Sequence, residues 1–325
     1  IEQRYTKQWH AFWKQEFSKK YNVKYIDGFP VDDKITNGRF LDINKTNYWK
    51  GSQVVYLADL FMHNKIKNND LFIFMDGWHP GIINLKYMLQ LNNIKAKIFT
   101  YLHAGSWDNE DFITQAGFRE WCCGFEESIM KVCDGHFVAT KYHKQIILDY
   151  FGEGLDKKIH VVGFPMDWEK EVKNIKRVKK ENIVVFPHRL DPEKQPEVFD
   201  NISKFFPHYN FIKTLEVTKN KKEYYDLLSR AKIVFSANLQ ETYGIGTVEG
   251  IMLGCIPVVP NRLSYIELYD KIFRYGDVYQ CKMNLDHFMG WYNKDDEKIL
   301  NKNKKKLIKQ SLEAIPKMIK IMEHK

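Results

Sequence analysis

The chain has 325 residues, a length typical of two domains, and 44% of its residues are apolar, 28% charged and 15% aromatic. No stretch reaches the roughly 18 consecutive apolar residues that a membrane-spanning helix needs, which excludes an integral helical membrane protein. The net charge of +9 makes phosphates, nucleic acid and anionic membranes candidate partners, with plain solvation of a lysine-rich chain as the alternative.

In the first half of the chain, short apolar runs alternate with helical patterns. We expect strands within the ranges 23–28, 70–81, 96–108, 135–143 and 158–168. We expect helices at 51–66, 83–94, 118–133 and 144–151. Loops with glycine, proline or histidine follow most of these strands, as in DGWHPG, LHAGSWD and ATKYH.

The charged run 169–182 has few apolar residues and follows Pro165, which favours a domain boundary near it. The alternation then restarts. We expect strands at 182–191, 210–214, 232–238 and 256–261. We expect helices at 194–206, 221–231, 247–255 and 264–273, followed by a basic helical tail at 295–325.

This alternation predicts an α/β protein with two Rossmann-like, doubly wound domains that face a cleft. The predicted domains are 1–168, on the acceptor side, and 169–300, which binds a nucleotide sugar. The segment 301–325 is expected to be a helix that packs back on the first domain. Ligands of such sheets bind beyond the carboxyl ends of the strands.

The segment LQETYGIGTVEG (239–250) allows three interpretations. Its glycines give GxGxxxG, one residue longer than a dinucleotide fingerprint, so an oxidoreductase is disfavoured. Alternatively, Glu241 and Glu249 are solvated charges. The third interpretation is a sugar-nucleotide site, because a helix N-terminus attracts phosphate and carboxylates accept hydrogen bonds from vicinal hydroxyls.

Four segments carry a resemblance in support of the third interpretation. ETYGIGTVE resembles the E-x7-E motif of retaining GT-B glycosyltransferases of the family-four type. GIMLGCIPVVPN, FPHRLDPEKQPEVFDNI and VVGFPMDW resemble other motifs of that family, in the expected order. The likeness covers about residues 158–270, while the N-terminal half matches in pattern alone. The resemblance implies the GT-B fold and a metal-independent transfer that needs no cofactor besides a nucleotide-sugar co-substrate, with UDP-sugar favoured over GDP-sugar.

The resemblance also implies roles for individual residues. Glu241 would contact the donor sugar and Glu249 the ribose, while Arg189 and Lys194 would neutralise the diphosphate. The other expected donor-binding residues are Tyr243, Gly244, Ile245, Gly246, Thr247, His188 and Gly163. In two places the chain departs from the family pattern: His188 and Gln195 replace glycines, which changes the backbone freedom of that loop.

The loops of the N-terminal half supply further candidates. His103 follows a predicted strand at a position where many relatives carry a histidine near the transferred sugar. On the acceptor side the candidates are Asp76, His79, Ser106, Asp108, Lys141 and His143. Each could equally be a turn residue whose side chain is satisfied within the protein. No metal-ligand spacing appears in the sequence, so no metal site is predicted.

The sequence says less about the acceptor. Basic charge with many aromatic residues favours nucleic acid. In addition, GCIPVVPNRLSYIEL resembles tRNA-queuosine mannosyltransferases. We therefore expect a modified base, in tRNA or in phage-type hydroxymethylated DNA, as the acceptor. Alternatives are a bacterial surface-polysaccharide or lipid-linked acceptor, and a non-catalytic binding protein.

Two further features concern the location of the protein. The stretch 8–21 has aromatic residues and lysines that could lie on a membrane, but an ordinary packed helix is favoured. The five cysteines form no CxxC pair, and an odd count argues against a disulfide framework. We therefore expect a reducing cytoplasm, in bacteria or in phage-infected cells.

Overall fold

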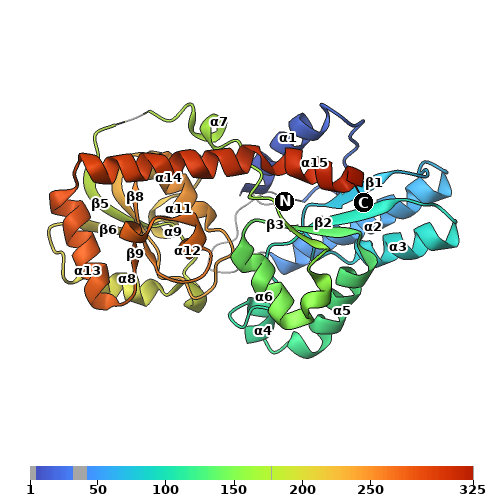
Figure 1. Ribbon diagram of the computed structural model, residues 1–325, viewed down its shortest axis with the longest axis horizontal. Helices are drawn as coiled ribbons and strands as arrows, with labels where there is room; N and C mark the ends of the chain where they lie inside the picture. Colours follow the sequence, from blue (N-terminus) through green and yellow to red (C-terminus); the bar gives the residue numbers. More distant parts are fainter. Residues whose placement is uncertain (1–4, 32–41, 177, 325) are drawn as a thin grey trace. The chain divides into compact units, whose positions relative to one another are not determined.

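A computed structural model describes residues 5–31, 42–176 and 178–324, which divide into two compact units. Unit 1 holds the described residues up to Pro165 together with those from Glu313 on, and unit 2 holds Met166–Leu312. Each unit has its own parallel sheet flanked by helices (Figure 1). The predicted α/β class with two Rossmann-like domains is thereby confirmed.

Unit 1 contains four parallel strands that follow one another across the sheet in chain order. They are β1 (Leu71–Phe74), β2 (Lys97–Tyr101), β3 (Gly135–Val138) and β4 (Ile159–Val161). Because crossovers between parallel strands are right-handed, this order places the connecting helices on one face. The helices that precede or connect these strands are α2 (Ile43–Met62), α3 (Gly81–Leu91), α4 (Phe112–Gln115), α5 (Arg119–Val132), α6 (Lys141–Phe151) and the 3₁₀ turn η1 (Glu153–Leu155).

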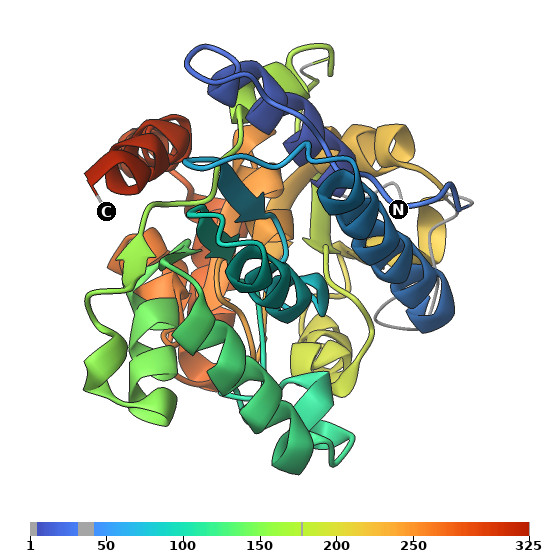
Figure 2. The same cartoon turned by 90° about the vertical axis from the view of Figure 1, so that its right-hand side faces the viewer.

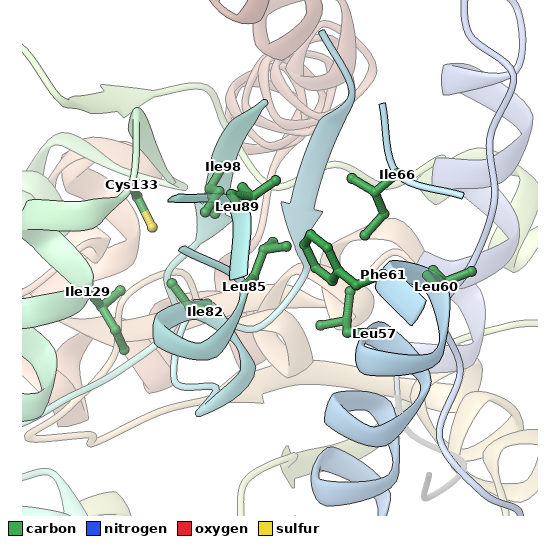
Figure 3. Packing of buried hydrophobic residues seen from close by; sticks show 10 residues of the cluster. All are labelled: Leu57, Leu60, Phe61, Ile66, Ile82, Leu85, Leu89, Ile98, Ile129 and Cys133. Carbon is green, nitrogen blue, oxygen red and sulfur yellow. The ribbon is translucent and has the colours of Figure 1, made fainter. Parts of the chain in front are cut away.

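The core beneath this sheet is built from α2, α3, α5 and β2 (Figure 3). Helices α2 and α3 pack against each other (Figure 2). Ile82 and Leu85 of α3 have no exposed surface, and Ile98 of β2 meets them from the sheet. Each such side chain contributes about 1.5–3 kcal/mol through burial, so this cluster fixes the position of the loops that follow β1 and β2.

The opposite face of the unit 1 sheet is covered by α1 (Tyr5–Phe17) and α15 (Ala314–His324) (Figure 1). Trp9 of α1 is buried and meets the ring of Tyr101 edge-on, with ring centroids 4.9 Å apart. Phe12, Trp13 and Phe17 are buried as well. The aromatic face of the stretch 8–21 therefore belongs to the protein core, as the packed-helix interpretation predicted.

The predicted strand at 23–28 is wrong, because these residues form no regular element. Their polar groups bond to helices instead of a neighbouring strand: Gln53 donates to the carbonyl of Ile26, and the Tyr25 hydroxyl donates to the carbonyl of His10. Gly28 lies so close to Trp49 that a Cβ there would sit 2.5 Å from the Trp49 carbonyl oxygen. The segment is therefore a packed connection between α1 and α2.

Unit 2 contains five parallel strands in the order β6-β5-β7-β8-β9. They are β5 (Glu181–Phe186), β6 (Asn210–Lys213), β7 (Ala231–Phe235), β8 (Ile256–Pro260) and β9 (Arg274–Tyr275). Its helices are α7 (Trp168–Val172), α8 (Pro196–Ser203), α9 (Thr214–Val217), α10 (Lys221–Arg230), α11 (Ile245–Met252), α12 (Tyr265–Leu268), α13 (Val278–Asp286) and α14 (Lys294–Leu312), with single turns at η2 (Pro192–Lys194), η3 (Lys271–Phe273) and η4 (His287–Trp291). The chain moves from β5 outward to β6, then returns to β7 on the other side of β5. This reversal is the topological switch point of the sheet.

Both ends of unit 2 differ from the predicted boundaries. The unit begins at Met166 instead of residue 169, because Trp168 is buried in it and donates to the Ser311 hydroxyl at 2.8 Å. The tail predicted as one helix at 301–325 is two helices that break near Glu313. Of these, α14 packs on α11 and α7 of unit 2, while α15 belongs to unit 1 and packs on α1. The return to the first unit therefore starts only at Glu313.

Candidate functional site

The principal candidate site lies in unit 2, where the loops after β5, β7 and β8 leave the carboxyl edge of the sheet. The loop after β5 carries Arg189 and Lys194, and the loop after β7 carries Glu241. Since β5 and β7 are neighbours at the switch point, their loops lie side by side there. The fold thus brings together residues that are about fifty positions apart in the sequence.

Glu241 and Lys194 meet at this edge. Their Oε2 and Nζ atoms are 3.8 Å apart, and Asn238 donates to the same carboxylate oxygen at 3.1 Å. Lys194 is buried and donates to the Gln240 carbonyl at 2.6 Å. Burial acts to raise the pKa of Glu241, but the charge of Lys194 and hydrogen bonds from the loop outweigh it, so the pKa is lowered. The site therefore holds a fixed cation and an ionised carboxylate.

Arg189 is engaged by its own loop. Its guanidinium pairs with Asp191 at 2.8 Å and with Glu193 at 2.8 Å. These carboxylates offset the charge of Arg189 and fix the orientation of its guanidinium group. A diphosphate would have to compete with them for Arg189. The ammonium of Lys194 is 3.8 Å from the nearest carboxylate oxygen, so its charge is offset less closely than that of Arg189.

His188 is buried at the base of the same loop, with its ring edge-on to Phe186. Its Nδ1 lies 3.4 Å from the amide nitrogen of Asn238. Burial, reinforced by the positive charges of Lys194 and Arg189, lowers the pKa of His188 to about 3, although Glu241 opposes the shift. The imidazole is therefore neutral at physiological pH and adds no charge to the site.

Glu249 lies on α11 and is buried, with three donors already on its carboxylate. Lys221 donates to Oε1 at 2.5 Å, the Tyr225 hydroxyl to Oε1 at 2.9 Å and the Tyr224 hydroxyl to Oε2 at 3.0 Å. A carboxylate offers about four acceptor positions, so little capacity is left for a ribose diol. The predicted ribose contact would require one of these donors, most simply the partly exposed Lys221, to move aside.

The two glycines that open α11 have local structural reasons. Gly244 is left-handed at φ 83°, a conformation that favours glycine. A Cβ at this position would sit 3.2 Å from the Tyr265 ring. A Cβ at Gly246 would sit 2.9 Å from the carbonyl oxygen of Pro187. The absence of a side chain at Gly246 thus lets the helix approach the loop that carries His188 and Arg189.

Replacing Gly246 with alanine should therefore damage unit 2. The new methyl group meets backbone that cannot move freely, and such overpacking costs about 1–3 kcal/mol. The matched control is Gly124→Ala in α5, where nothing lies within 4 Å of the added Cβ. That change should stabilise by about 0.5–1 kcal/mol through helix propensity. Urea unfolding of both variants measures the difference, and effects of the same sign would contradict this assignment.

The other residues predicted at the start of α11 are tied to the protein interior. The side chain of Tyr243 is buried, and its hydroxyl lies 3.2 Å from the Ser311 hydroxyl. Burial raises the pKa of Tyr243 to about 12. Thr247 is fully buried, and Ile245 is the first residue of the helix. Because its side chain is buried, Tyr243 could contact a ligand only through its backbone. Its N–H donates to Glu241 Oε1 at 3.4 Å.

Arg262, in the loop after β8, is a residue that the sequence analysis missed. Its Nε donates to the Asn238 carbonyl at 2.9 Å, and its Nη2 donates to the Ala237 carbonyl at 2.5 Å and to Gln195 Oε1 at 3.0 Å. We call Arg262 and Gln195 the loop clamp, because they join all three site loops. The signal that could have revealed it is an arginine two residues after the buried strand IPVVP.

The loop clamp explains a departure from the family pattern. In the resemblance described above, Gln195 takes the place of a glycine, and its backbone is left-handed at φ 56°. This conformation costs a non-glycine residue about 1–2 kcal/mol. The hydrogen bond to the charged Arg262, worth about 1.5–3 kcal/mol, outweighs that cost, so the chain retains a glycine-like turn without a glycine.

Unit 1 has a smaller polar group at the carboxyl edge of its own sheet. Lys50 of α2 bonds to Asp76 Oδ2 at 2.6 Å and to the Trp78 carbonyl at 2.5 Å. Although burial acts to raise the pKa of Asp76, Lys50 and His103 lower it. The Nε2 of His103 lies 2.9 Å from the Met75 carbonyl, and burial lowers the pKa of this histidine. Asp76 and His103 therefore do lie together, as an ionised carboxylate beside a neutral imidazole.

His79 is better assigned to the structure of α3 than to an acceptor. It is buried, its Nδ1 accepts from the Gly81 N–H at 2.9 Å, and its Nε2 donates to Gln53 at 3.1 Å. Burial lowers the pKa of His79 to about 4. Both ring nitrogens are used, and the ring caps the first turn of the helix.

Ser106 is likewise buried and bound, to a carboxylate that the sequence analysis missed. Glu126 of α5 accepts from the Ser106 N–H at 2.9 Å and from the Ser106 hydroxyl. It also accepts from the Trp78 indole at 3.0 Å. Glu126 therefore joins the loops after β1 and β2. Burial raises the pKa of this carboxyl group, despite its hydrogen bonds.

Glu126→Gln tests whether the negative charge of this buried carboxylate lowers the stability of the protein. A raised pKa means that folding disfavours the charged form, so the stability of the protein falls as the pH rises above about 4.5. Glutamine can keep all three contacts without charge, since its oxygen accepts and its amide donates. We expect the variant to match or exceed the native stability at pH 8, with a smaller difference at pH 4.5. Urea unfolding at both pH values measures the difference, with the exposed Glu120→Gln as control. A loss of stability in Glu126→Gln that is confined to pH 8 would contradict the expectation.

The remaining candidates are dispersed within unit 1. Asp108 accepts from the Glu110 N–H at 2.9 Å within its own turn, and Lys141 is exposed at the start of α6. His143 is fully buried, which lowers its pKa to about 3, so it does not face solvent as an acceptor contact would require. Gly163 belongs to unit 1, not to the donor-site loops, and its carbonyl accepts from the Tyr101 hydroxyl at 2.9 Å.

Within the ranges 5–31, 42–176 and 178–324, no group of three or more His, Cys, Asp or Glu side chains could hold a metal ion. Over the same part of the chain, every helix is too short or too polar to cross a membrane.

The two parallel-sheet units define the GT-B fold, and comparisons with known proteins place this chain among its members by fold. The chain is similar to an α,α-trehalose-phosphate synthase (UDP-forming) from Burkholderia xenovorans, with 10% identity, a TM-score of 0.62, and coverage of 87% of this chain and 79% of that one. It is also similar to a TarM mutant from S. aureus in complex with UDP, with 14% identity, a TM-score of 0.59, and coverage of 83% and 58%.

The chain is also similar in sequence to a curated protein. That protein is a tRNA-queuosine alpha-mannosyltransferase from Drosophila melanogaster, with 24% identity over 160 residues, covering 38% of this chain and 42% of the relative. The match therefore spans less than half of the relative's length. No family model matches the chain.

Proposed function

We propose that this protein is a glycosyltransferase that moves a sugar from a nucleotide sugar, with a UDP-sugar as the favoured donor, to an acceptor hydroxyl. The observation that carries the proposal is the meeting of Lys194 and Glu241 at the switch point of unit 2. Open α/β sheets bind nucleotides at such points. The GT-B structures that the chain resembles include several with UDP in their descriptions.

The chemistry follows from the charges of these two residues. When the bond between sugar and diphosphate breaks, negative charge develops on the leaving oxygen. A cation fixed beside it stabilises the transition state more than the ground state. Lys194 would supply this charge, with Arg189 in a secondary role because Asp191 and Glu193 already engage it. Ionised Glu241 would accept hydrogen bonds from sugar hydroxyls, and the resemblance implies retention of the anomeric configuration.

For the acceptor, we propose a modified base in nucleic acid. Support comes from the likeness to a tRNA-queuosine mannosyltransferase and from the net charge of +9. All five cysteines are free thiols, which suits a reducing cytoplasm where nucleotide sugars and nucleic acid meet. Transfer onto tRNA and hydroxymethylated DNA, followed by mass spectrometry with UDP- and GDP-sugars, tests this proposal. A product on neither nucleic acid would overturn the proposed acceptor.

A saccharide acceptor is the second candidate, and one surface of unit 1 favours it. Trp121 and Phe118 are 59% and 46% exposed, and their ring centroids lie 6.4 Å apart. Exposed Glu120 and Glu127 flank them, with Arg119 beside Glu120 and Lys131 paired to Glu127 at 2.8 Å. This surface therefore has no excess of positive charge for phosphate and suits a neutral sugar ring. Lipid-linked and polysaccharide acceptors therefore belong in the same panel. Calorimetry with UDP beside a turnover assay separates both candidates from a binding protein without activity.

A further inference from the structure

Unit 1 has a groove on the edge of its sheet opposite to the Asp76 and His103 loops. Its volume is about 520 Å³, within the range of known ligand sites. Leu71 and Lys97, the first residues of β1 and β2, line it, together with the C-terminal half of α3 and the end of α15. The groove thus lies at the amino ends of the strands.

The charge of the groove is positive. Lys86, Lys95 and Lys97 all line it, and the single acidic residue among the lining residues is Glu323. Glu323 forms an ion pair with Lys20, which raises the pKa of that lysine. The carboxylate is therefore already matched by a cation, and the three lining lysines remain in excess.

The loops that form the groove are held firmly by the backbone. The Asn69 N–H donates to the Lys95 carbonyl at 2.7 Å, and the Lys95 N–H donates to Asn68 Oδ1 at 2.8 Å. These bonds join the turn before β1 to the turn before β2. The turn before β1 adds two further exposed lysines, Lys65 and Lys67. The result is an edge where two hydrogen-bonded turns and one helix present lysines.

The polar side chains that accompany the lysines suit an anion with many oxygens. Asn69, Gln90 and Tyr21 line the groove and can donate hydrogen bonds to phosphate oxygens. Lysine binds phosphate as a compact point charge and therefore tolerates variable geometry. This property suits a phosphate backbone that can adopt several conformations.

We propose that this groove binds the phosphate backbone of the nucleic acid that carries the acceptor base. The inference rests on the proposed function for the kind of ligand, while the groove itself is separate from the donor site. Lysines spread over two turns and a helix match a run of phosphates better than a single one. Contacts with the backbone hold the substrate without reading its sequence. A free sugar phosphate offers the same chemistry and is the competing source.

The test compares two double variants of the full chain that have equal net charge. Lys86→Gln with Lys95→Gln alters the groove. Lys222→Gln with Lys298→Gln alters two exposed lysines of unit 2, whose side chains are 82% and 78% exposed. Binding of a short labelled RNA stem–loop is followed by fluorescence anisotropy from about 50 to 200 mM salt. Thermal melts confirm that both variants fold.

We expect the groove variant to bind RNA about three- to tenfold more weakly and to lower the slope of log K against log salt by roughly 1.5–2. The control should match the native protein. Equal losses in both variants, or no loss in either, would overturn the proposal. So would groove-dependent binding of glucose-6-phosphate or inorganic phosphate without any RNA binding. The affinity for UDP, measured by calorimetry, should be the same in the groove variant and the native protein. If the native protein bound RNA but neither UDP nor a donor sugar, the proposed function would be refuted while the groove proposal would stand.

Discussion

Lys194→Met should lower kcat for sugar transfer by about 10²–10³-fold, the usual loss when one group that stabilises developing negative charge is removed. Methionine keeps the length of the side chain but removes the charge. The native ammonium is buried and lies 3.8 Å from Glu241. Arg189→Met should cost less, because Asp191 and Glu193 already offset the guanidinium. Steady-state kinetics with the donor varied measure both effects.

The matched control is Lys213→Met, a lysine of the same unit that is 16% exposed and bonds to Asp200 at 2.6 Å. It should leave kcat unchanged. If Lys194→Met raised only KM, the lysine would contribute equally to ground state and transition state. If it changed neither constant, the assignment of the leaving-group cation would be wrong.

The same variant should shift the acid side of the pH–rate profile. Burial acts to raise the pKa of Glu241, and Lys194 is the largest charge that opposes it. Without that charge, Glu241 gains a proton at a higher pH. Since the ionised carboxylate is the form that accepts hydrogen bonds, we expect the activity of Lys194→Met to be lost at a higher pH than that of the native protein.

Much of the fold was predictable because its elements are strongly patterned. Short apolar runs such as LFIF and IPVVP are bounded by turn residues, and they became β1 and β8. The stretch 23–28 has the composition of a strand, but no strand among the described residues pairs with it. Its hydrogen bonds to the His10 carbonyl of α1 and the Gln53 side chain of α2 depend on tertiary packing, which a local pattern does not encode.

The sequence could place Lys194 and Glu241 in loops that follow predicted strands. Their meeting depends on the adjacency of β5 and β7, a reversal in strand order that a βαβ pattern alone does not specify. Whether a side chain faces solvent was not predictable in this way. His79 and His143 also lie near strand ends, yet both are buried. Nor could the sequence reveal the donors on Glu249, which come from α10 and reach it through packing.

Disruption of the loop clamp should have the second large effect on stability and activity. Arg262→Met removes a charged donor from two buried carbonyls and from Gln195, which should destabilise unit 2 by about 2–4 kcal/mol. The loops that carry Lys194 and Glu241 would lose their common support. A displacement of about 1 Å can cost 10²-fold in rate, so we expect a comparable fall in kcat/KM. Arg274→Met is the control, because this arginine donates from its Nη1 to exposed Asn261 at 2.9 Å.

A double-mutant cycle with Gln195→Gly separates the clamp from general damage. In the native background glycine relieves the left-handed backbone but loses the bond to Arg262, so we expect a loss of about 1 kcal/mol. In the Arg262→Met background that bond is already gone, and the same change should stabilise by about 0.5–1 kcal/mol. Urea unfolding of the four proteins gives the coupling directly. Effects that add within about 0.5 kcal/mol would show that the two residues act independently and that the turn needs no clamp.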